Sequence, residues 1–193
     1  MTHVTRTPRV MQWPVPAGVN EQILQRAARV KLAVFDVDGV LTDGRLHYGP
    51  DGEDLKVFST LDGHGLKMLQ ESRVELAIIS GRASKALAKR ARDLQITQLF
   101  MGVSAKREVF DQLLASLSID ATEAAGLGDD VVDLPFLTRC GFAACVPAAP
   151  SYMKEHVHYV TQAAGGRGAV REFCEIIMHA QGTLDAALQK YLE

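Results

Sequence analysis

The chain reads LAVFDVDGVLTDG from Leu32 to Gly44, and this stretch decides how the rest is interpreted. Four apolar residues lead into two carboxylates, Asp36 and Asp38, and then into a glycine turn. Residues two apart on a strand share a face, so an extended start would aim both carboxylates the same way. Close carboxylates repel each other unless a cation or a proton lies between them, and an aspartate can attack phosphorus. The stretch therefore indicates phosphoryl transfer with a metal ion, although a strand ending in a polar turn has the same pattern.

Three later apolar runs also end in polar groups. Ser80 follows the first of these runs, Lys106 the second and Asp129 the third. In an open parallel sheet, ligands bind beyond the carboxyl ends of the strands. Four strand ends would thus bring a nucleophile, a hydrogen-bond donor, a cation and metal ligands to one edge, which is what phosphoryl transfer needs.

The alternation of strands and helices predicts an α/β fold, a Rossmann-like doubly wound parallel sheet with helices on both faces. The predicted strands are Leu32–Phe35, Leu76–Ile79, Leu99–Met101, Ala124–Leu127, Phe142–Val146 and Tyr159–Val160. The predicted helices are Glu21–Ala28, Ser84–Leu94, Lys106–Leu117, Val131–Thr138 and Val170–His179.

The segment from Arg45 to Phe58 interrupts this rhythm and is predicted to form a β-hairpin that overhangs the site as a flap. The gaps between the motifs leave no room for a cap domain. We expect an irregular N-terminal arm over residues 1–18, one catalytic domain over 19–180 and a helical tail over 181–193.

Composition excludes several classes of partner. The net charge is −2, from 21 basic and 23 acidic residues, so neither nucleic acid nor an anionic membrane is an expected partner. The N-terminus has no apolar core of a signal peptide, which favours the cytoplasm. The three cysteines lack metal-binding spacing and are expected to be buried reduced thiols.

Taken in order, the four motifs resemble the haloacid dehalogenase superfamily of phosphohydrolases, over a span from about Lys31 to Arg171. The segment GGRGAVRE, from Gly165 to Glu172, resembles more narrowly the 3-deoxy-D-manno-octulosonate 8-phosphate phosphatases, a capless group. The resemblance implies magnesium-dependent hydrolysis of a small phosphorylated sugar acid through an aspartyl-phosphate, in lipopolysaccharide precursor synthesis. It also implies a homotetramer whose subunits cover one another's sites.

Roles for the central residues follow from this resemblance. Asp36 is the expected nucleophile, and Asp38 the acid and base that serves the leaving group and then water. Asp36, Asp129 and the backbone carbonyl of Asp38 are the expected Mg²⁺ ligands. Ser80 and Lys106 are expected to bind the phosphate.

Two further acids, Asp130 and Asp133, have two possible roles. They could hold metal-bound water or orient Lys106. Alternatively, they are N-terminal charges of the helix that follows.

The resemblance places substrate contacts at Asp38, Ser59, Thr60, Leu61, Asp62, Gly63, Lys67, Arg82, Arg90 and Lys106. Two positions depart from the family, because Leu61 and Lys67 stand where arginine is expected. Arg90 could equally belong to a basic helix surface. Arg167 could reach a neighbour's active site or lie in a flexible loop.

Three alternatives stay open. A related nonulosonate 9-phosphate phosphatase would be expected to differ at Arg82 and in the glycine-rich segment. A non-catalytic, phosphatase-like regulatory domain would keep the fold with degraded motifs. A receiver domain also forms an aspartyl-phosphate, but it lacks a counterpart of Asp38.

Overall fold

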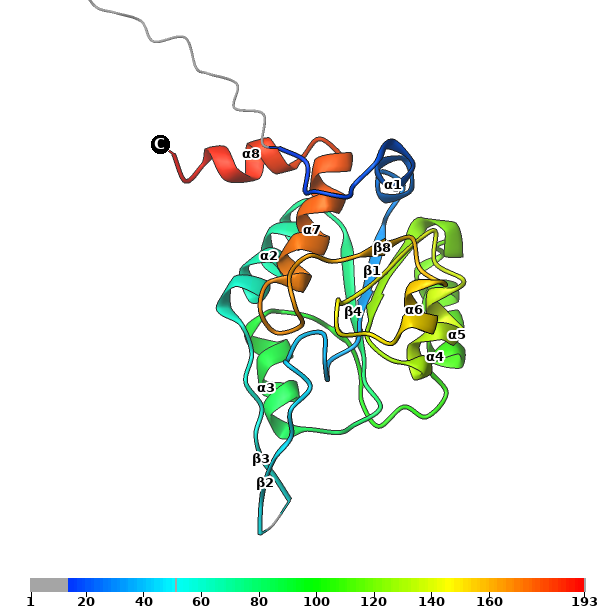
Figure 1. The fold of residues 1–193 in the computed structure, drawn as a ribbon. Coiled ribbons are helices and arrows are strands. Elements are labelled where there is room, and N and C mark those ends of the chain that lie inside the picture. Colours follow the sequence, from blue (N-terminus) through cyan, green and yellow to red (C-terminus); the bar gives the residue numbers. More distant parts are fainter. Residues whose placement is uncertain (1–13, 51, 193) are drawn as a thin grey trace, which may run out of the picture.

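A computed structural model describes residues 14–50 and 52–192 of the chain (Figure 1). Its main sheet has six strands in the order β5-β4-β1-β6-β7-β8, and every pairing in it is parallel. The strands are β1 Leu32–Phe35, β4 Glu75–Ile79, β5 Gln98–Phe100, β6 Ala124–Gly128, β7 Phe142–Cys145 and β8 Tyr159–Val160. All six predicted strands are confirmed, with ends that differ by one residue at most.

The helices are α1 Glu21–Ala27, α2 Thr60–Glu71, α3 Lys85–Asp93, α4 Lys106–Leu117, α5 Leu134–Leu137, α6 Ser151–Lys154, α7 Ala169–Ala180 and α8 Leu184–Gln189. Figure 1 shows α2, α3 and α7 on one side of the sheet and α4, α5 and α6 on the other. The predicted doubly wound α/β fold is confirmed, and the described residues include no cap domain.

One predicted helix is different in the structure. The segment Val131–Thr138 begins as a 3-10 turn over Val131–Asp133 and continues as the single-turn helix α5. The side chain of Asp133 accepts bonds from the backbone amides of Asp129 and Asp130, and this local bonding shapes the tight turn.

The centre of the sheet is apolar because both of its faces are covered. All four residues of β1 are buried, as a strand of a parallel sheet requires. Phe173 of α7 stacks on Phe142 at 5.0 Å between ring centroids and meets the edge of Phe35 at 5.9 Å. These rings fix α7, which covers one face, against the strand that carries the aspartate motif.

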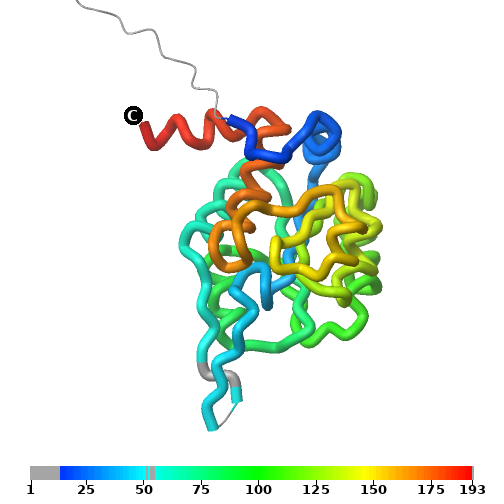
Figure 2. Tube along the Cα trace, in the orientation of Figure 1, coloured from blue at the N-terminus to red at the C-terminus, as the bar shows by residue number. Residues whose placement is uncertain are grey.

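The predicted hairpin is confirmed. It consists of β2 His47–Gly49 and β3 Gly52–Leu55, which pair antiparallel. In Figure 2 the hairpin projects from the end of the sheet opposite α1 and the C-terminus. Strand β1 runs from α1 toward that end, so the hairpin stands beside the carboxyl ends of the strands.

The terminal segments pack on the domain. Residues 1–13 of the predicted arm lie outside the described residues, and the Tyr159 hydroxyl donates to the Ala17 carbonyl at 3.2 Å. The predicted helical tail is present as α8, and after it the Tyr191 ring meets His64 of α2 at 5.5 Å. Among the described helices, none combines the length and the apolar character needed to cross a membrane. Cys140, Cys145 and Cys174 are buried and free, as predicted.

Candidate active site

The carboxyl ends of β1, β4 and β6, together with the start of α4, surround one pocket of about 290 Å³. Its lining residues are Asp36, Asp38, Gly81, Arg82, Val103, Ser104, Lys106, Asp129, Asp130 and Val132. The structure thus brings together the strand-end residues that the sequence selected.

Asp36 lies just beyond β1 and is 6% exposed. The ammonium of Lys106, on the first residue of α4, lies 2.5 Å from Asp36 Oδ1 and 2.5 Å from Asp133 Oδ1. The other oxygen of Asp133 accepts from the amides of Asp129 and Asp130, at 3.0 and 3.4 Å. Asp133 therefore orients Lys106. One of its carboxylate oxygens accepts from Lys106 and the other accepts from the two backbone amides.

The crowding of carboxylates shifts their pKa values. Burial, followed by the charge of Asp133, raises the pKa of Asp36 to about 8. Burial and the charges of Asp133 and Asp130 raise the pKa of Asp129 to about 7. Burial opposes the charge on Lys106, but Asp36 and Asp133 outweigh it and hold the pKa of Lys106 above its ordinary value.

The pocket suits a hard cation. Oxygen atoms of Asp36, Asp129 and Asp133 lie within 4.8 Å of one another. Because Asp133 is engaged by Lys106 and two amides, Asp36 and Asp129 are the carboxylates available for Mg²⁺, which favours one or two such ligands. Burial first, and then the neighbouring carboxylates, make the charged forms of Asp36 and Asp129 costly, and a bound cation would offset that cost. Gly39 is essential here, because a Cβ on it would lie 2.1 Å from Asp129 Oδ2.

Asp38 is placed between two cations. Its Oδ1 pairs with the ammonium of Lys56, whose side chain is only 3% exposed, and its Oδ2 lies 3.8 Å from Arg82 Nε. Arg82 also donates to the hydroxyl of Tyr48 on β2, at 2.8 Å. Sequence analysis did not identify Lys56, because nothing in its local sequence separates it from an ordinary solvated lysine.

Ser80 follows β4 and is 2% exposed. Its hydroxyl accepts from the amide of Arg82 at 3.2 Å, while its own amide donates to Phe100 at the end of β5. The residue therefore joins the ends of two strands, and the next two residues, Gly81 and Arg82, line the pocket.

The segment Ser59–Gly63 forms the start of α2. Ser59 caps the helix by accepting from the amide of Asp62 at 3.3 Å, and its carbonyl accepts from Arg90 Nη2 at 3.1 Å. The guanidinium of Arg90 covers Gly63, where a Cβ would lie 2.1 Å from Nη2. In this structure Arg90 thus supports the loop that was expected to bind substrate.

Asp62 differs from the sequence expectation. It is 1% exposed, and its carboxylate accepts from the amides of Gly168 and Arg171, at 3.2 and 2.9 Å. The structure therefore directs Asp62 into the protein, toward α7, and away from the pocket.

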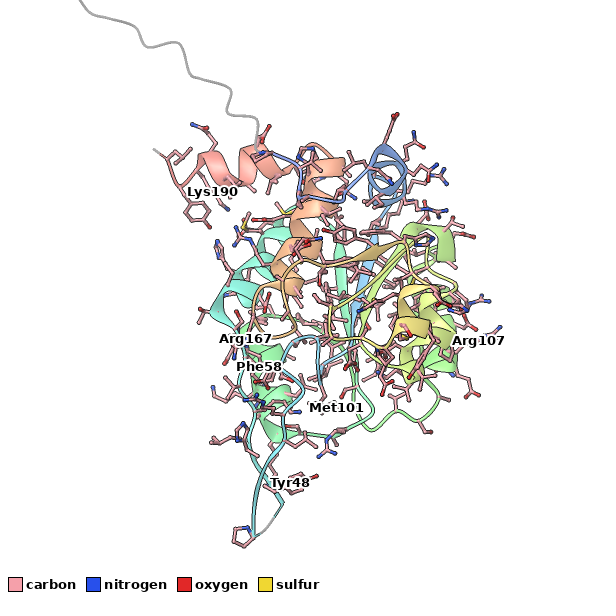
Figure 3. All side chains as sticks on the ribbon, viewed as in Figure 1. Tyr48, Phe58, Met101, Arg107, Arg167 and Lys190 are labelled. Carbon is pink, nitrogen blue, oxygen red and sulfur yellow. The ribbon has the colours of Figure 1, made fainter. Side chains whose placement is uncertain are left out.

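A second hollow of about 400 Å³ lies beside the aspartate motif. It is lined by Asp43, Val57, Phe58, Ser59, Thr60, Gly166 and Arg167. Figure 3 shows Arg167 and Phe58 close together beside the start of α2. Leu61 is 52% exposed nearby, with its Cδ2 3.5 Å from where a Cβ of Gly168 would lie. Lys67 lies elsewhere, in a surface hollow with Gln70, Glu71 and Gln95.

Comparison with known proteins places this arrangement in a family. No model of a protein family matches the chain. A 3-deoxy-D-manno-octulosonate 8-phosphate phosphatase of Yersinia pestis is 42% identical over 169 residues, which are 88% of this chain and 90% of that protein. A crystal structure of a probable yrbi family phosphatase from Pseudomonas syringae is 51% identical with a TM-score of 0.89, covering 90% of this chain and 99% of that one.

A third comparison shows such an enzyme with its ligands. It is the octulosonate phosphatase of Moraxella catarrhalis, solved in complex with magnesium, phosphate and the sugar acid KDO. It is 38% identical with a TM-score of 0.86, and the match covers 88% of this chain and 98% of that one. Sequence identity and fold agree over nearly the whole domain, and the chain belongs to the 3-deoxy-D-manno-octulosonate 8-phosphate phosphatase family of the haloacid dehalogenase superfamily.

Proposed function

We propose that this chain hydrolyses 3-deoxy-D-manno-octulosonate 8-phosphate to the free sugar acid and inorganic phosphate, a step of lipopolysaccharide precursor synthesis. The observation that carries the proposal is the buried contact of Asp36 with Lys106, next to Asp129 at one pocket. A strand-end carboxylate beside a lysine and a second acid can attack phosphorus and have the phosphate charge offset. The named relatives support the choice of substrate.

In the proposed reaction, a carboxylate oxygen of Asp36 attacks phosphorus while the bond from phosphorus to the oxygen on carbon 8 breaks. Asp38 gives its proton to that departing oxygen. Asp38 then takes a proton from water as the water oxygen attacks phosphorus, and the bond between phosphorus and Asp36 breaks. Phosphate leaves, and both aspartates return to their starting states.

We propose that Asp36, Asp129 and the backbone carbonyl of Asp38 hold Mg²⁺. When bound, the ion offsets the repulsion between the carboxylates and the phosphate and polarises a phosphate oxygen. Lys106 neutralises part of the same charge and keeps Asp36 in place, and Asp133 orients Lys106. Ser80 supplies a hydroxyl at the rim for a phosphate oxygen.

Lys56 and Arg82 serve Asp38 in this proposal. Because each of them faces a different carboxylate oxygen, the carboxyl plane is restrained before substrate binds. Charge-assisted contacts of this kind are about twice as strong as neutral ones. Arg82 also lines the pocket, and we propose that it contacts the anionic end of the sugar acid as well.

The sugar end is proposed to extend toward the second hollow, past Ser59 and Thr60, where Arg167 supplies positive charge. Leu61 offers no cation there, and Lys67 lies in a separate hollow. We therefore infer that this chain grips the sugar acid with fewer guanidinium groups than the family pattern implies.

We also propose that neighbouring subunits complete the site in a homotetramer located in the cytoplasm. No cap domain is present among the described residues that could cover the pocket. The hairpin region exposes Leu46, Tyr48, Leu55 and Val57, at 41 to 66%. Exposed apolar side chains gathered on one projection are typical of an interaction surface. The free buried thiols fit a reducing compartment.

Phosphate release by the purified chain tests the proposal. The substrates are octulosonate 8-phosphate, a nonulosonate 9-phosphate and common hexose phosphates, each with Mg²⁺ and with excess chelator. We expect the octulosonate ester to be preferred, with release abolished by chelator and restored by Mg²⁺. Asp36→Asn serves as the inactive control. Preference for the nonulosonate ester would transfer the assignment to that substrate, and no release from any ester would support a non-catalytic domain.

A further inference from the structure

The glycine-rich segment Gly165–Gly168 lies directly on the backbone of the aspartate motif. The amide of Gly166 donates to the carbonyl of Val40 at 2.8 Å. A Cβ on Gly165 would lie 1.7 Å from the carbonyl oxygen of Gly39, closer than any real contact. Gly165 is buried, so the segment is packed against the motif and is not a free loop.

Thr42 completes the contact from the side of the motif. Its hydroxyl is buried, donates to the carbonyl of Val37 at 3.3 Å and accepts from the amide of Gly44 at 3.2 Å. A Cβ on Gly166 would lie 2.6 Å from the carbonyl carbon of Thr42. The turn after Asp38 is thus stabilised by the hydroxyl of Thr42, which bonds to backbone groups of the turn itself, and by the close packing of Gly165 and Gly166 against its backbone.

Asp62 holds the far end of the same segment. Its Oδ2 accepts from the amide of Gly168 and its Oδ1 from the amide of Arg171. Gly168 begins α7 with φ of +110° and carries no side chain that could cap the helix. A carboxylate from α2 therefore takes the role that an N-cap residue usually has, and its negative charge is favourable at a helix N-terminus.

These contacts form a continuous path. It begins at Asp62, one residue after Leu61 and two after Thr60 of the second hollow. It passes through Gly168 and Gly165 to Gly39, which lies one residue after Asp38. A hydrogen bond to a backbone amide joins Asp62 to Gly168, three residues of chain join Gly168 to Gly165, and Gly165 meets Gly39 in a contact that leaves no room for a side chain.

We propose that Asp62 is a positioning residue, which fixes the turn after Asp38 through Gly165–Gly168 and so sets where Asp38 meets the leaving group. This inference rests on the proposed function, because it assigns Asp38 as the acid and base. It gives the buried carboxylate a role in the reaction without contact with substrate, and it explains why Gly165 tolerates no side chain.

The variants Asp62→Asn and Gly165→Ala test the proposal with two substrates that lack any sugar. The phenolate of p-nitrophenyl phosphate leaves without a proton, whereas phenyl phosphate has a poorer leaving group and depends on Asp38. General acid help is worth roughly 10²–10⁴-fold, so a displaced Asp38 should cost phenyl phosphate about ten times more kcat/KM than p-nitrophenyl phosphate. The ratio is taken in kcat/KM because this quantity reports the formation of the aspartyl-phosphate, whereas kcat also contains the water step that both esters share.

Asp93→Asn and Gly182→Ala are the matched controls. Asp93 is exposed on α3. A Cβ on Gly182 would meet nothing within 4 Å, but the φ of +68° strains an alanine there, so this control shows the effect of backbone strain far from the pocket. Both controls should keep the wild-type ratio of the two rates. Loss of folded protein lowers both rates equally and leaves the ratio unchanged, and if Gly165→Ala fails to fold, the milder Asp62→Asn still gives the measurement.

A changed ratio in Asp62→Asn supports the positioning role. An unchanged ratio, whether activity is full or uniformly reduced, overturns it and leaves Asp62 as a helix cap only. A wild-type chain without phosphatase activity would instead contradict the proposed function itself, so the two failures are distinguishable.

Discussion

At the scale of single residues, each proposed catalytic carboxylate is restrained by a lysine. Lys106 holds Asp36, and Lys56 holds Asp38. One ammonium group comes from the start of α4 and the other from the chain after β3. The carboxylates of Asp36 and Asp38 therefore have different partners, which fits the different roles proposed for them.

The substitution Arg82→Ala tests whether Arg82 recognises the sugar acid. We expect KM for octulosonate 8-phosphate to rise by roughly 10- to 100-fold, since a charged hydrogen bond contributes about 1.5–3 kcal/mol. The rise in KM for p-nitrophenyl phosphate, which has no sugar acid, should be much smaller, and any fall in its kcat reports the loss of the contact between Arg82 and Asp38. Steady-state kinetics on both esters measure this, with Arg92→Ala on the exposed side of α3 as the control. Equal losses on both esters would place Arg82 in the phosphoryl-transfer step.

Metal binding should depend on pH through Asp36 and Asp129. Their pKa values are raised to about 8 and about 7, so in metal-free protein their contribution to stability is greatest at low pH and is lost as pH rises through 7 to 8. Mg²⁺ binds the deprotonated carboxylates and removes their repulsion. The rise in melting temperature on adding Mg²⁺ should therefore be larger at pH 8 than at pH 6. A rise that shrinks over this range would contradict the assigned ligands.

At the scale of elements, the hairpin is fixed to the site at two points. Tyr48 of β2 bonds to Arg82, and Lys56, one residue beyond β3, pairs with Asp38. The hairpin is therefore linked to the site, because Lys56 and Tyr48 contact two residues that line the pocket, Asp38 and Arg82.

Lys56→Met should lower kcat by roughly 10- to 100-fold, because it removes a charged contact worth about 1.5–3 kcal/mol from Asp38. The methionine keeps most of the buried chain, so the melting temperature should change little. Lys89→Met, which removes an ammonium from a lysine that is 72% exposed, is the control. Activity unchanged in Lys56→Met would show that Asp38 needs no restraint from the hairpin.

Local pattern was sufficient for the strands but not for every helix or every contact. Apolar runs and their polar ends predicted six strands and the pocket around Asp36, because strand ends of a parallel sheet meet at one edge. The roles of Lys56 and Asp62 could not be predicted in this way. Lys56 lies 18 residues from its partner and Asp62 over 100 residues from Gly168, so only the packed structure brings them together.

At the scale of the whole molecule, the pocket and the hairpin face the same end of the sheet, while α8 packs back on α2 near Glu71 at the other end. The apolar side chains of the hairpin region are 41 to 66% exposed among the described residues. The proposed homotetramer would cover these side chains and would also close the pocket. Assembly and activity would therefore be linked.

Leu55→Glu tests that link. Leu55 is 63% exposed on β3, and a buried unpaired carboxylate would weaken a subunit contact there. Light scattering should show the native chain as a tetramer and the variant as a smaller species with a higher KM. Val15→Glu, at a 36% exposed position in the N-terminal segment, is the control. A wild-type chain that is monomeric and fully active would contradict the proposed assembly.

The most direct test of the central claim is the reaction of Asp38→Asn with p-nitrophenyl phosphate and Mg²⁺. The phenolate leaves without a proton, so Asp36 can still be phosphorylated, but the water step lacks its base. The account predicts a burst of about one p-nitrophenolate per active site, followed by slow turnover, with a phosphoryl group on Asp36 in the acid-quenched protein. Linear release without a burst, and an unmodified Asp36, would contradict it.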